Sequence, residues 1–191
     1  MNLLIFHLHD MGRYCSPYGH ALHTPNIERI AKEGTVFRQA HCEAPTCSPS
    51  RAALLTGETS HQSGLYGLAH RGRFRLKDQT KHLGYILGQN GYETAMAGVQ
   101  HEYNEDAGPI PYQHELTQNV SDPKTRDRNA ADAAVDYLDQ PKDKPFFLWV
   151  GMFLPHRPFI NADKHDYPVD FVRTPDPLHD TPEVRAEMRD Y

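Results

Sequence analysis

Short apolar segments alternate with amphipathic helix patterns along most of the 191 residues, and this alternation limits the folds open to the chain. Residues 146–150 are apolar without polar alternates, which is typical of a parallel strand buried on both faces. Other apolar or β-branched segments predict strands at 2–8, 36–40 and 92–97. Capping residues, prolines and glycines place helices at 24–34, 49–57, 80–90 and 125–138. The sequence therefore predicts an α/β fold with a mostly parallel sheet flanked by helices.

The chain is poor in core-forming residues for its length. Apolar residues, with Tyr counted, make up 38%, and mean hydropathy is −0.70. Counting Gly in place of Tyr gives about 40%, below the roughly 45–50% of globular domains. Six of the 15 prolines lie within 155–182, which predicts an extended Pro-rich loop there. Thr181-Pro182 is typical of a helix start, and we expect the chain to end within that helix.

Composition excludes several classes of protein. The net charge of −5 does not favour binding to nucleic acid or to an anionic membrane. No stretch approaches the roughly 20 apolar residues of a membrane span. Three cysteines cannot all pair within the chain, which argues against a disulfide framework. The 13 histidines indicate a site rich in imidazole. No signal peptide is visible, so localisation stays open between the cytoplasm and, if a leader was removed, the periplasm or exterior.

The end of the first predicted strand carries the first candidate ligands. His7, His9 and Asp10 lie there, and sites in parallel α/β sheets gather at the carboxyl ends of strands. An acid at this place suits a hard divalent cation such as Ca²⁺ or Mg²⁺. The plainer alternative is that His7 is a hydrogen-bonded core residue and His9 a loop residue.

The second candidate segment is Cys47-Ser48-Pro49-Ser50-Arg51. It places a cysteine at the start of a predicted helix, where unpaired N–H groups and the helix dipole favour an anion. Arg51, one turn later, can add a planar cation. The alternative is a small buried thiol beside a capped helix.

These segments resemble the sulfatase family. Cys47-Ser48-Pro49-Ser50-Arg51 matches its signature C-x-P-S-R, and Leu55-Thr56-Gly57 matches the continuation L-T-G. Further matches are residues 2–10, 23–27 and 98–101, with Pro155-His156-Arg157-Pro158-Phe159 similar to H-x-P-F. The His9-Asp10 and Gln100-His101-Glu102 variants most resemble the branch of the N-sulfoglucosamine sulfohydrolases. The resemblance implies an alkaline phosphatase-like fold, with residues 1–191 as the N-terminal part of a longer catalytic domain.

The resemblance also implies a modified residue and a metal. In the family, a formylglycine-generating enzyme oxidises the signature cysteine, and the hydrated aldehyde lies near a divalent metal, usually Ca²⁺. Cys47 is then the precursor of the nucleophile and a metal ligand together with Asp10 and His9. His9 replaces the family's first acidic ligand.

The remaining implied roles concern the transferred group. Arg51 orients and stabilises the diol of formylglycine, while His101 and His156 are proton donors or sulfate-binding groups. The expected substrate is a sulfate ester or sulfamate, carried by a small molecule or a sugar of a sulfated glycan. The sequence leaves the exact substrate and the oligomeric state open, and the fragment alone is expected to be weakly active or inactive.

Three other functions remain open. A phosphonate or phosphate monoester hydrolase of the same superfamily fits the same residues. A non-catalytic truncated homologue that binds glycans is the second alternative. The third is an amidohydrolase-type zinc enzyme, because His7-x-His9 at the end of a first strand resembles the start of such barrels. This third hypothesis does not explain the segment from Cys47 to Gly57.

Overall fold

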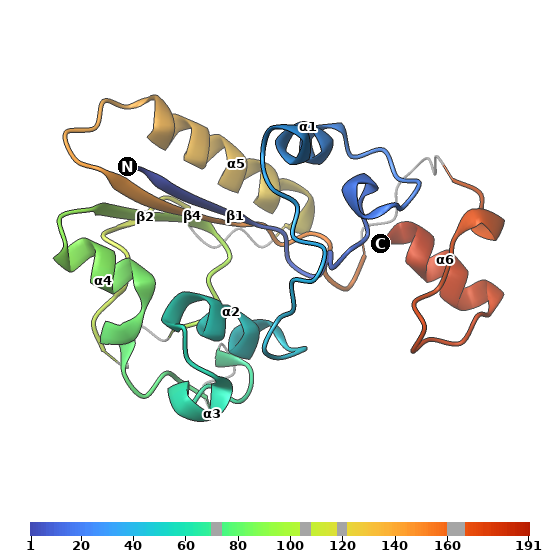
Figure 1. Cartoon of the computed structure of the whole chain (residues 1–191), viewed down its shortest axis with the longest axis horizontal. Helices are drawn as coiled ribbons and strands as arrows, with labels where there is room; N and C mark the ends of the chain where they lie inside the picture. Colours follow the sequence, from blue (N-terminus) through green and yellow to red (C-terminus); the bar gives the residue numbers. More distant parts are fainter. Residues whose placement is uncertain (70–73, 104–107, 118–121, 160–166) are drawn as a thin grey trace.

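A parallel sheet of four strands forms the centre of the described chain (Figure 1). This computed structural model describes residues 1–69, 74–103, 108–117, 122–159 and 167–191. The strand order is β1-β4-β2-β3, with bounds Leu3–His7 for β1, Phe146–Gly151 for β4, Glu93–Gly98 for β2 and His114–Glu115 for β3. All three pairings are parallel. The predicted fold class is therefore confirmed.

Strand β4 is central because it can be buried on both sides. All six of its residues are buried, and it pairs with β1 on one edge and with β2 on the other. His7, Gly151 and Gly98 stand in register at the carboxyl ends of the three strands. This row marks the edge of the sheet at which the candidate residues gather.

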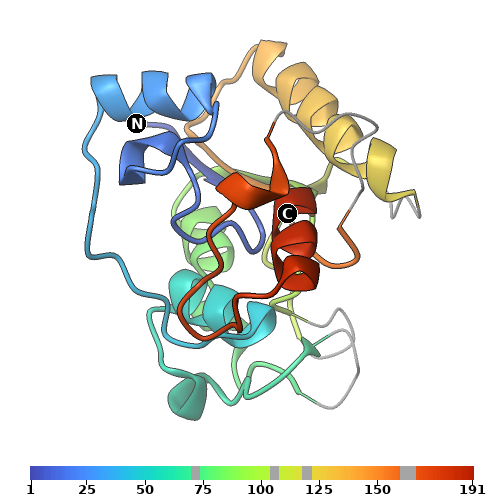
Figure 2. The same ribbon diagram turned by 90° about the vertical axis from the view of Figure 1, so that its right-hand side faces the viewer.

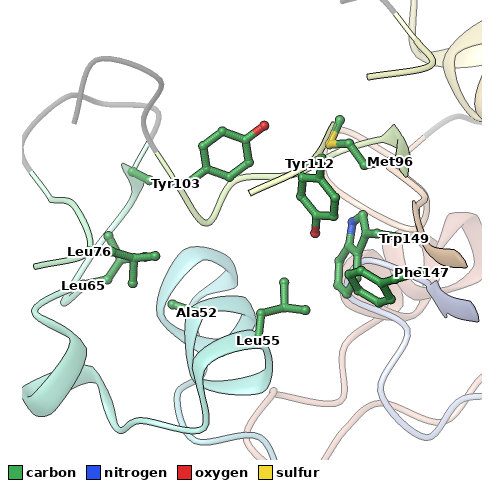
Figure 3. Close-up of a cluster of buried hydrophobic side chains, with 10 residues drawn as sticks. Ala52, Leu55, Leu65, Leu76, Met96, Tyr103, Tyr112, Phe147 and Trp149 are labelled. Carbon is green, nitrogen blue, oxygen red and sulfur yellow. The ribbon is translucent and has the colours of Figure 1, made fainter. Parts of the chain in front are cut away.

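Helices cover both faces of the sheet (Figure 1). Helix α5 (Pro123–Asp139) packs on β2 and β4, and its core cluster comprises Ala95, Ala97, Ala130, Ala134, Tyr137, Phe146, Leu148 and Val150. Helices α2 (Cys47–Thr56) and α4 (Leu83–Gln89) lie on the opposite face. Figure 3 shows the cluster beneath them, in which Leu55 of α2 approaches Phe147 and Trp149 of β4.

The other helical segments lie around this core. They are α1 (Pro25–Glu33), α3 (Ser60–Ser63), α6 (Pro182–Asp190), and the 3₁₀ turns η1 (Ser16–Tyr18), η3 (Gln79–Lys81) and η5 (Val169–Phe171). Figure 2 looks onto the carboxyl edge of the sheet, with α6 in front of the strand ends. The Tyr191 hydroxyl donates a hydrogen bond to the Asp10 carbonyl at 2.5 Å, which ties the end of the chain to this edge.

The prediction of a strand at 36–40 is wrong. Arg38 and Gln39 form a turn, and Phe37 is 70% exposed. Val and Phe favour extended backbone, but a strand also needs a neighbouring strand to pair with, and this segment has none. The helix expected over 80–90 is divided into η3 and α4, because the His82 ring caps the second part by accepting from the Gly84 N–H at 3.0 Å.

One further expectation is met only in part by the described residues. Within the predicted loop 155–182, residues 160–166 lie outside the described residues, and the other parts contain η5 and the start of α6.

All three cysteines are free thiols. Among the described helices, none is long and apolar enough to span a membrane.

Candidate functional site

The loops that follow β1 and β4 are joined by backbone hydrogen bonds. The N–H groups of His9 and Asp10 donate to the carbonyls of Leu154 and Pro155 at 3.3 and 3.1 Å. This pairing brings the His156 ring to a centroid distance of 4.5 Å from the His9 ring. Three of the predicted site residues, His9, Asp10 and His156, therefore lie together although 146 positions separate the last two.

The His9 ring is buried and has one nitrogen left without a partner. Its side chain is 1% exposed, and Nδ1 lies 2.8 Å from Asp10 Oδ1. An ionised carboxylate only accepts, so Nδ1 carries the proton and Nε2 carries the lone pair. Nε2 is buried with no hydrogen-bond partner. Burial lowers the pKa of His9 from 6.5, against the opposing effect of Asp10, which favours the neutral ring at neutral pH.

Helix α2 presents Cys47 at its first position and Arg51 one turn later. The Ser48 hydroxyl accepts from the Ala69 N–H at 3.1 Å, which fixes the start of the helix. Arg51 is 1% exposed, and its Nη1 donates to the Val99 carbonyl at 3.0 Å. Its Nε and Nη2 are buried without partners. The N–H groups of these two nitrogens of a fixed planar cation are thus left for a ligand.

The end of β2 brings in His101 through an unusual backbone. Gly98 has φ +85°, and a Cβ there would lie 2.0 Å from the Gly151 carbonyl oxygen, so only glycine fits. Three residues later His101 has φ 58°, a left-handed conformation that non-glycine residues adopt at an energetic cost. Its ring lies 5.8 Å from the His9 ring. Such strained positions concentrate at functional sites.

Within the part of the chain that the structure describes, two overlapping groups of side chains could hold a metal. One is His9, Cys47 and His101, and the other is His9, Asp10 and His156. Within each group the donor atoms lie within 4.8 Å of one another. The structure thus places all the predicted metal ligands and three of the four predicted catalytic residues in these two groups, and Arg51 lies behind them on α2.

A buried acid–base pair lies behind this site and was not predicted from the sequence. His82 and Glu102 are both 0% exposed, with Nε2 and Oε1 3.9 Å apart. Burial raises the pKa of Glu102, while His82 and Arg51 oppose the rise. Glu102 follows His101 directly, but nothing in its sequence context shows that the side chain turns inward.

Asp127 of α5 is a second residue that the sequence did not reveal. Its Oδ1 accepts from the Phe153 N–H at 2.6 Å and its Oδ2 from the Leu154 N–H at 2.8 Å. The carboxylate therefore holds the start of the loop that carries His156. An aspartate on the polar side of a helix pattern is usually a solvated charge, so no local signal could distinguish it.

The donors do not fit a calcium site while Cys47 is a thiol. Ca²⁺ takes six to eight oxygen ligands, whereas His9, Cys47 and His101 offer nitrogen and sulfur. Asp10 is the one carboxylate in the two groups of described donors. Ca²⁺ as the resident ion stays a prediction that depends on oxygen donors from a modified residue 47 or from elsewhere.

Comparison with known proteins decides the family. The family model described as Sulfatase matches residues 2–191. The chain belongs to the sulfatase family. Among the relatives of this sulfatase-family chain is the human N-sulphoglucosamine sulphohydrolase, 32% identical over 82% of this chain and 32% of the human protein. A sulfatase of Formosa agariphila is 27% identical over 99% of this chain and 47% of its own length.

Solved structures agree with the family. The structure of a protein in complex with its substrate D-glucosamine-2-N,6-O-disulfate superposes with a TM-score of 0.66 at 25% identity, over 85% of this chain and 35% of that protein. A putative sulfatase from Bacteroides fragilis gives a TM-score of 0.71 at 22% identity, over all of this chain and 54% of the other. The sulfatase-family chain spans about a third to a half of the length of these two curated relatives.

Proposed function

We propose that this chain carries catalytic residues of a hydrolase that removes sulfate from a sulfated sugar, as a sulfate ester or a sulfamate. The observation that carries the proposal is the buried Arg51 fork, held at Nη1 and unpaired at Nε and Nη2. Two parallel N–H donors suit two oxygens of a tetrahedral anion. Arg51 lies in the first turns of α2, whose N-cap residue Thr46 makes no side-chain cap hydrogen bond, and the start of a helix favours an anion.

The sugar substrate is supported by what the relatives act on. The human relative is named for N-sulphoglucosamine, and one structural neighbour holds a glucosamine that carries both N- and O-sulfate. Neither comparison separates sulfate esters from sulfamates. The proposed substrate class is therefore a sulfated amino sugar, with the position of the sulfate open.

The site residues have different proposed roles, according to where each lies in the site. Formylglycine at position 47, as a hydrated aldehyde, would supply a hydroxyl nucleophile and a second hydroxyl for release of sulfate. Arg51 offsets negative charge that develops on the oxygens of the transferring group. His101 and His156 are half-buried at the rim of the site, where either ring can donate a proton to the leaving oxygen or nitrogen.

The first test is the chemical state of residue 47. The full chain is co-expressed with a formylglycine-generating enzyme, and the tryptic peptide 39–51 is examined by mass spectrometry. We expect the mass of formylglycine in place of cysteine. An unmodified thiol in that sample contradicts the proposal for this chain.

The second test measures turnover by the converted chain. Rates are compared on glucosamine N-sulfate, an aryl sulfate and an aryl phosphonate, for the unsubstituted chain, Arg51→Lys and Arg29→Lys. Lys keeps the charge but loses the fork, so Arg51→Lys should lower kcat/KM at least about 100-fold. Arg29 is exposed on α1, and its replacement should leave the rate unchanged. Faster turnover of the phosphonate would instead support a phosphonate hydrolase, and no turnover of any substrate would show that residues 1–191 do not catalyse the reaction alone.

A further inference from the structure

We propose that the chain with Cys47 as a thiol binds one Zn²⁺-class transition-metal ion through His9 Nε2, Cys47 Sγ and His101, and that formylglycine at position 47 removes this site. The three donor atoms come from the end of β1, the start of α2 and the loop after β2, and they lie within 4.8 Å of one another. Zn²⁺ bonds of about 2.0–2.3 Å in a tetrahedron place ligand atoms about 3.3–3.6 Å apart. Small side-chain rotations bring the three atoms to that spacing.

The unpaired nitrogen of His9 is the observation that indicates a ligand here. Nε2 belongs to a side chain that is 1% exposed, and it has no hydrogen-bond partner. A buried polar atom without a partner costs about 1–3 kcal/mol, so a ligand that uses its lone pair stabilises the fold. Asp10 Oδ1 at 2.8 Å holds the opposite nitrogen of the same ring.

This carboxylate–imidazole contact is the arrangement that supports metal-bound histidines. A histidine ligand usually donates its second ring N–H to a carboxylate or carbonyl, which fixes the tautomer and raises the basicity of the ligating nitrogen. Asp10 therefore acts on the metal through His9 in this site and does not need to bind it. This distinguishes the His9, Cys47 and His101 group from the alternative with Asp10 and His156.

The donor chemistry selects the class of metal. One thiolate and two imidazoles suit Zn²⁺ and its neighbours in the first transition series, whereas Ca²⁺ and Mg²⁺ require oxygen ligands. Three protein ligands leave the fourth tetrahedral position open to water or an anion, and Arg51 lies close enough to Cys47 for the two charges to interact. On binding, the S–H bond of Cys47 is replaced by an S–metal bond, and the proton passes to solvent.

This metal state has a consequence for maturation. Formylglycine lacks the sulfur atom, so conversion removes one of the three ligands. The thiolate site and formylglycine at position 47 are therefore mutually exclusive in one chain.

The binding test uses the full chain, expressed without a formylglycine-generating enzyme and freed of metal. Zn²⁺ is titrated in competition with a chromogenic chelator, and Co²⁺ is used as a spectroscopic probe. We expect one ion per chain, a submicromolar Kd for Zn²⁺, and a thiolate-to-cobalt charge-transfer band. Ca²⁺ in millimolar excess should not displace the Zn²⁺.

Variants then assign the ligands. Cys47→Ala should abolish the charge-transfer band and weaken Zn²⁺ binding at least about 100-fold, while Cys42→Ala, at an exposed cysteine, should change neither. His9→Gln and His101→Gln should each weaken binding at least about 10-fold, and Asp10→Asn about 10-fold through loss of the support for His9. His156→Gln should stay within about twofold of the unsubstituted chain. Circular dichroism checks that every variant is folded.

Three results would overturn the inference. The first is a Kd for Zn²⁺ that is the same with and without Cys47. The second is a loss in His156→Gln as large as that in His101→Gln, which would assign the ion to the other group. The third is a Kd for Zn²⁺ that is the same for converted and unconverted chain. Because these measurements record metal binding, their failure is distinct from failure of the sulfatase proposal, which is judged from formylglycine formation and turnover.

Discussion

Arg51 and Trp149 donate hydrogen bonds to the same carbonyl oxygen, that of Val99, each at 3.0 Å. The guanidinium carbon of Arg51 also lies 5.6 Å from the Trp149 ring centroid. Trp149 is 0% exposed at the centre of the sheet. The cation proposed to bind the anion is therefore fixed by the hydrophobic core as well as by its own helix.

Trp149→Phe tests this connection. The variant loses the donor to Val99 and leaves a small cavity, so the free energy of unfolding should fall by about 2–3 kcal/mol. Tyr66→Phe is the control, because it removes a 3.4 Å hydrogen bond to the His61 carbonyl from an exposed ring and should cost less than about 0.5 kcal/mol. Chemical denaturation measures both. Equal free energies of unfolding for Trp149→Phe and the unsubstituted chain would show that the hydrogen bond to the Val99 carbonyl does not stabilise the fold.

A pair of glycines with the same backbone conformation separates strain from crowding. Gly98 and Gly91 have φ +85° and +86°, but a Cβ meets the Gly151 carbonyl oxygen at 2.0 Å only at position 98. Gly91→Ala should cost about 1 kcal/mol for the left-handed conformation alone. Gly98→Ala should cost at least about 3 kcal/mol more or prevent folding. Thermal and chemical unfolding of the two variants give the difference directly, and similar losses would refute the close approach of β2 and β4.

The two hydrogen bonds accepted by Asp127 predict a stability effect at the loop after β4. Asp127→Ala leaves the N–H groups of Phe153 and Leu154 without their carboxylate partner and should cost about 2–4 kcal/mol. Asp132→Ala, at an exposed site on the same helix, should change stability by less than about 0.5 kcal/mol. Hydrogen exchange at residues 153 and 154 should accelerate only in the first variant. Unchanged protection there would contradict the contact.

Sequence patterns predicted the elements whose signal is local. The apolar run of β4 reflects burial on both faces, and Pro49 and Gly57 mark the start and end of α2, so both elements could be placed in advance. The same kind of signal was misleading at 36–40, because Val36 and Phe37 favour extended backbone without specifying a pairing partner. A strand forms only where a second strand is available to pair with it, and the tertiary fold, not the local sequence, determines whether that second strand is present.

The candidate site divides in the same way. Cys47 and Arg51 lie one helical turn apart, so a short motif contains their geometry. The contacts of Asp127 with Phe153 and Leu154 span 26 and 27 positions, and the buried side chain of Glu102 contacts Tyr112 and His82. Contacts of this kind depend on how the helices pack on the sheet, which no local pattern encodes.

Burial of His7 predicts an acid-dependent loss of stability in the metal-free protein. Desolvation, followed by the charges of Arg51 and His9, lowers the pKa of His7 to about 4. The unfolded chain has a histidine pKa near 6.5, so between about pH 6.5 and 4 the unfolded state binds a proton that the folded state does not. Stability should therefore fall over this range by up to about 3 kcal/mol and should be independent of His7 above it.

His7→Gln tests the same prediction. The variant removes the titrating ring, so its unfolding free energy should fall less steeply between pH 6.5 and 4 than that of the unsubstituted chain. The readout is the difference between the two slopes, because other buried histidines contribute to both. Parallel curves would show that His7 titrates with the same pKa in both states.

The contact between Tyr191 and Asp10 decides at which end of the chain a purification tag can be placed. A purification tag fused after Tyr191 would emerge beside the loop that holds the His9 ring. Met1 is 90% exposed at the opposite edge of the sheet, and the five-residue strand β1, about 17 Å long, separates it from the histidines. An amino-terminal tag, free of histidines or cleaved before any metal titration, leaves the chemistry of that edge undisturbed.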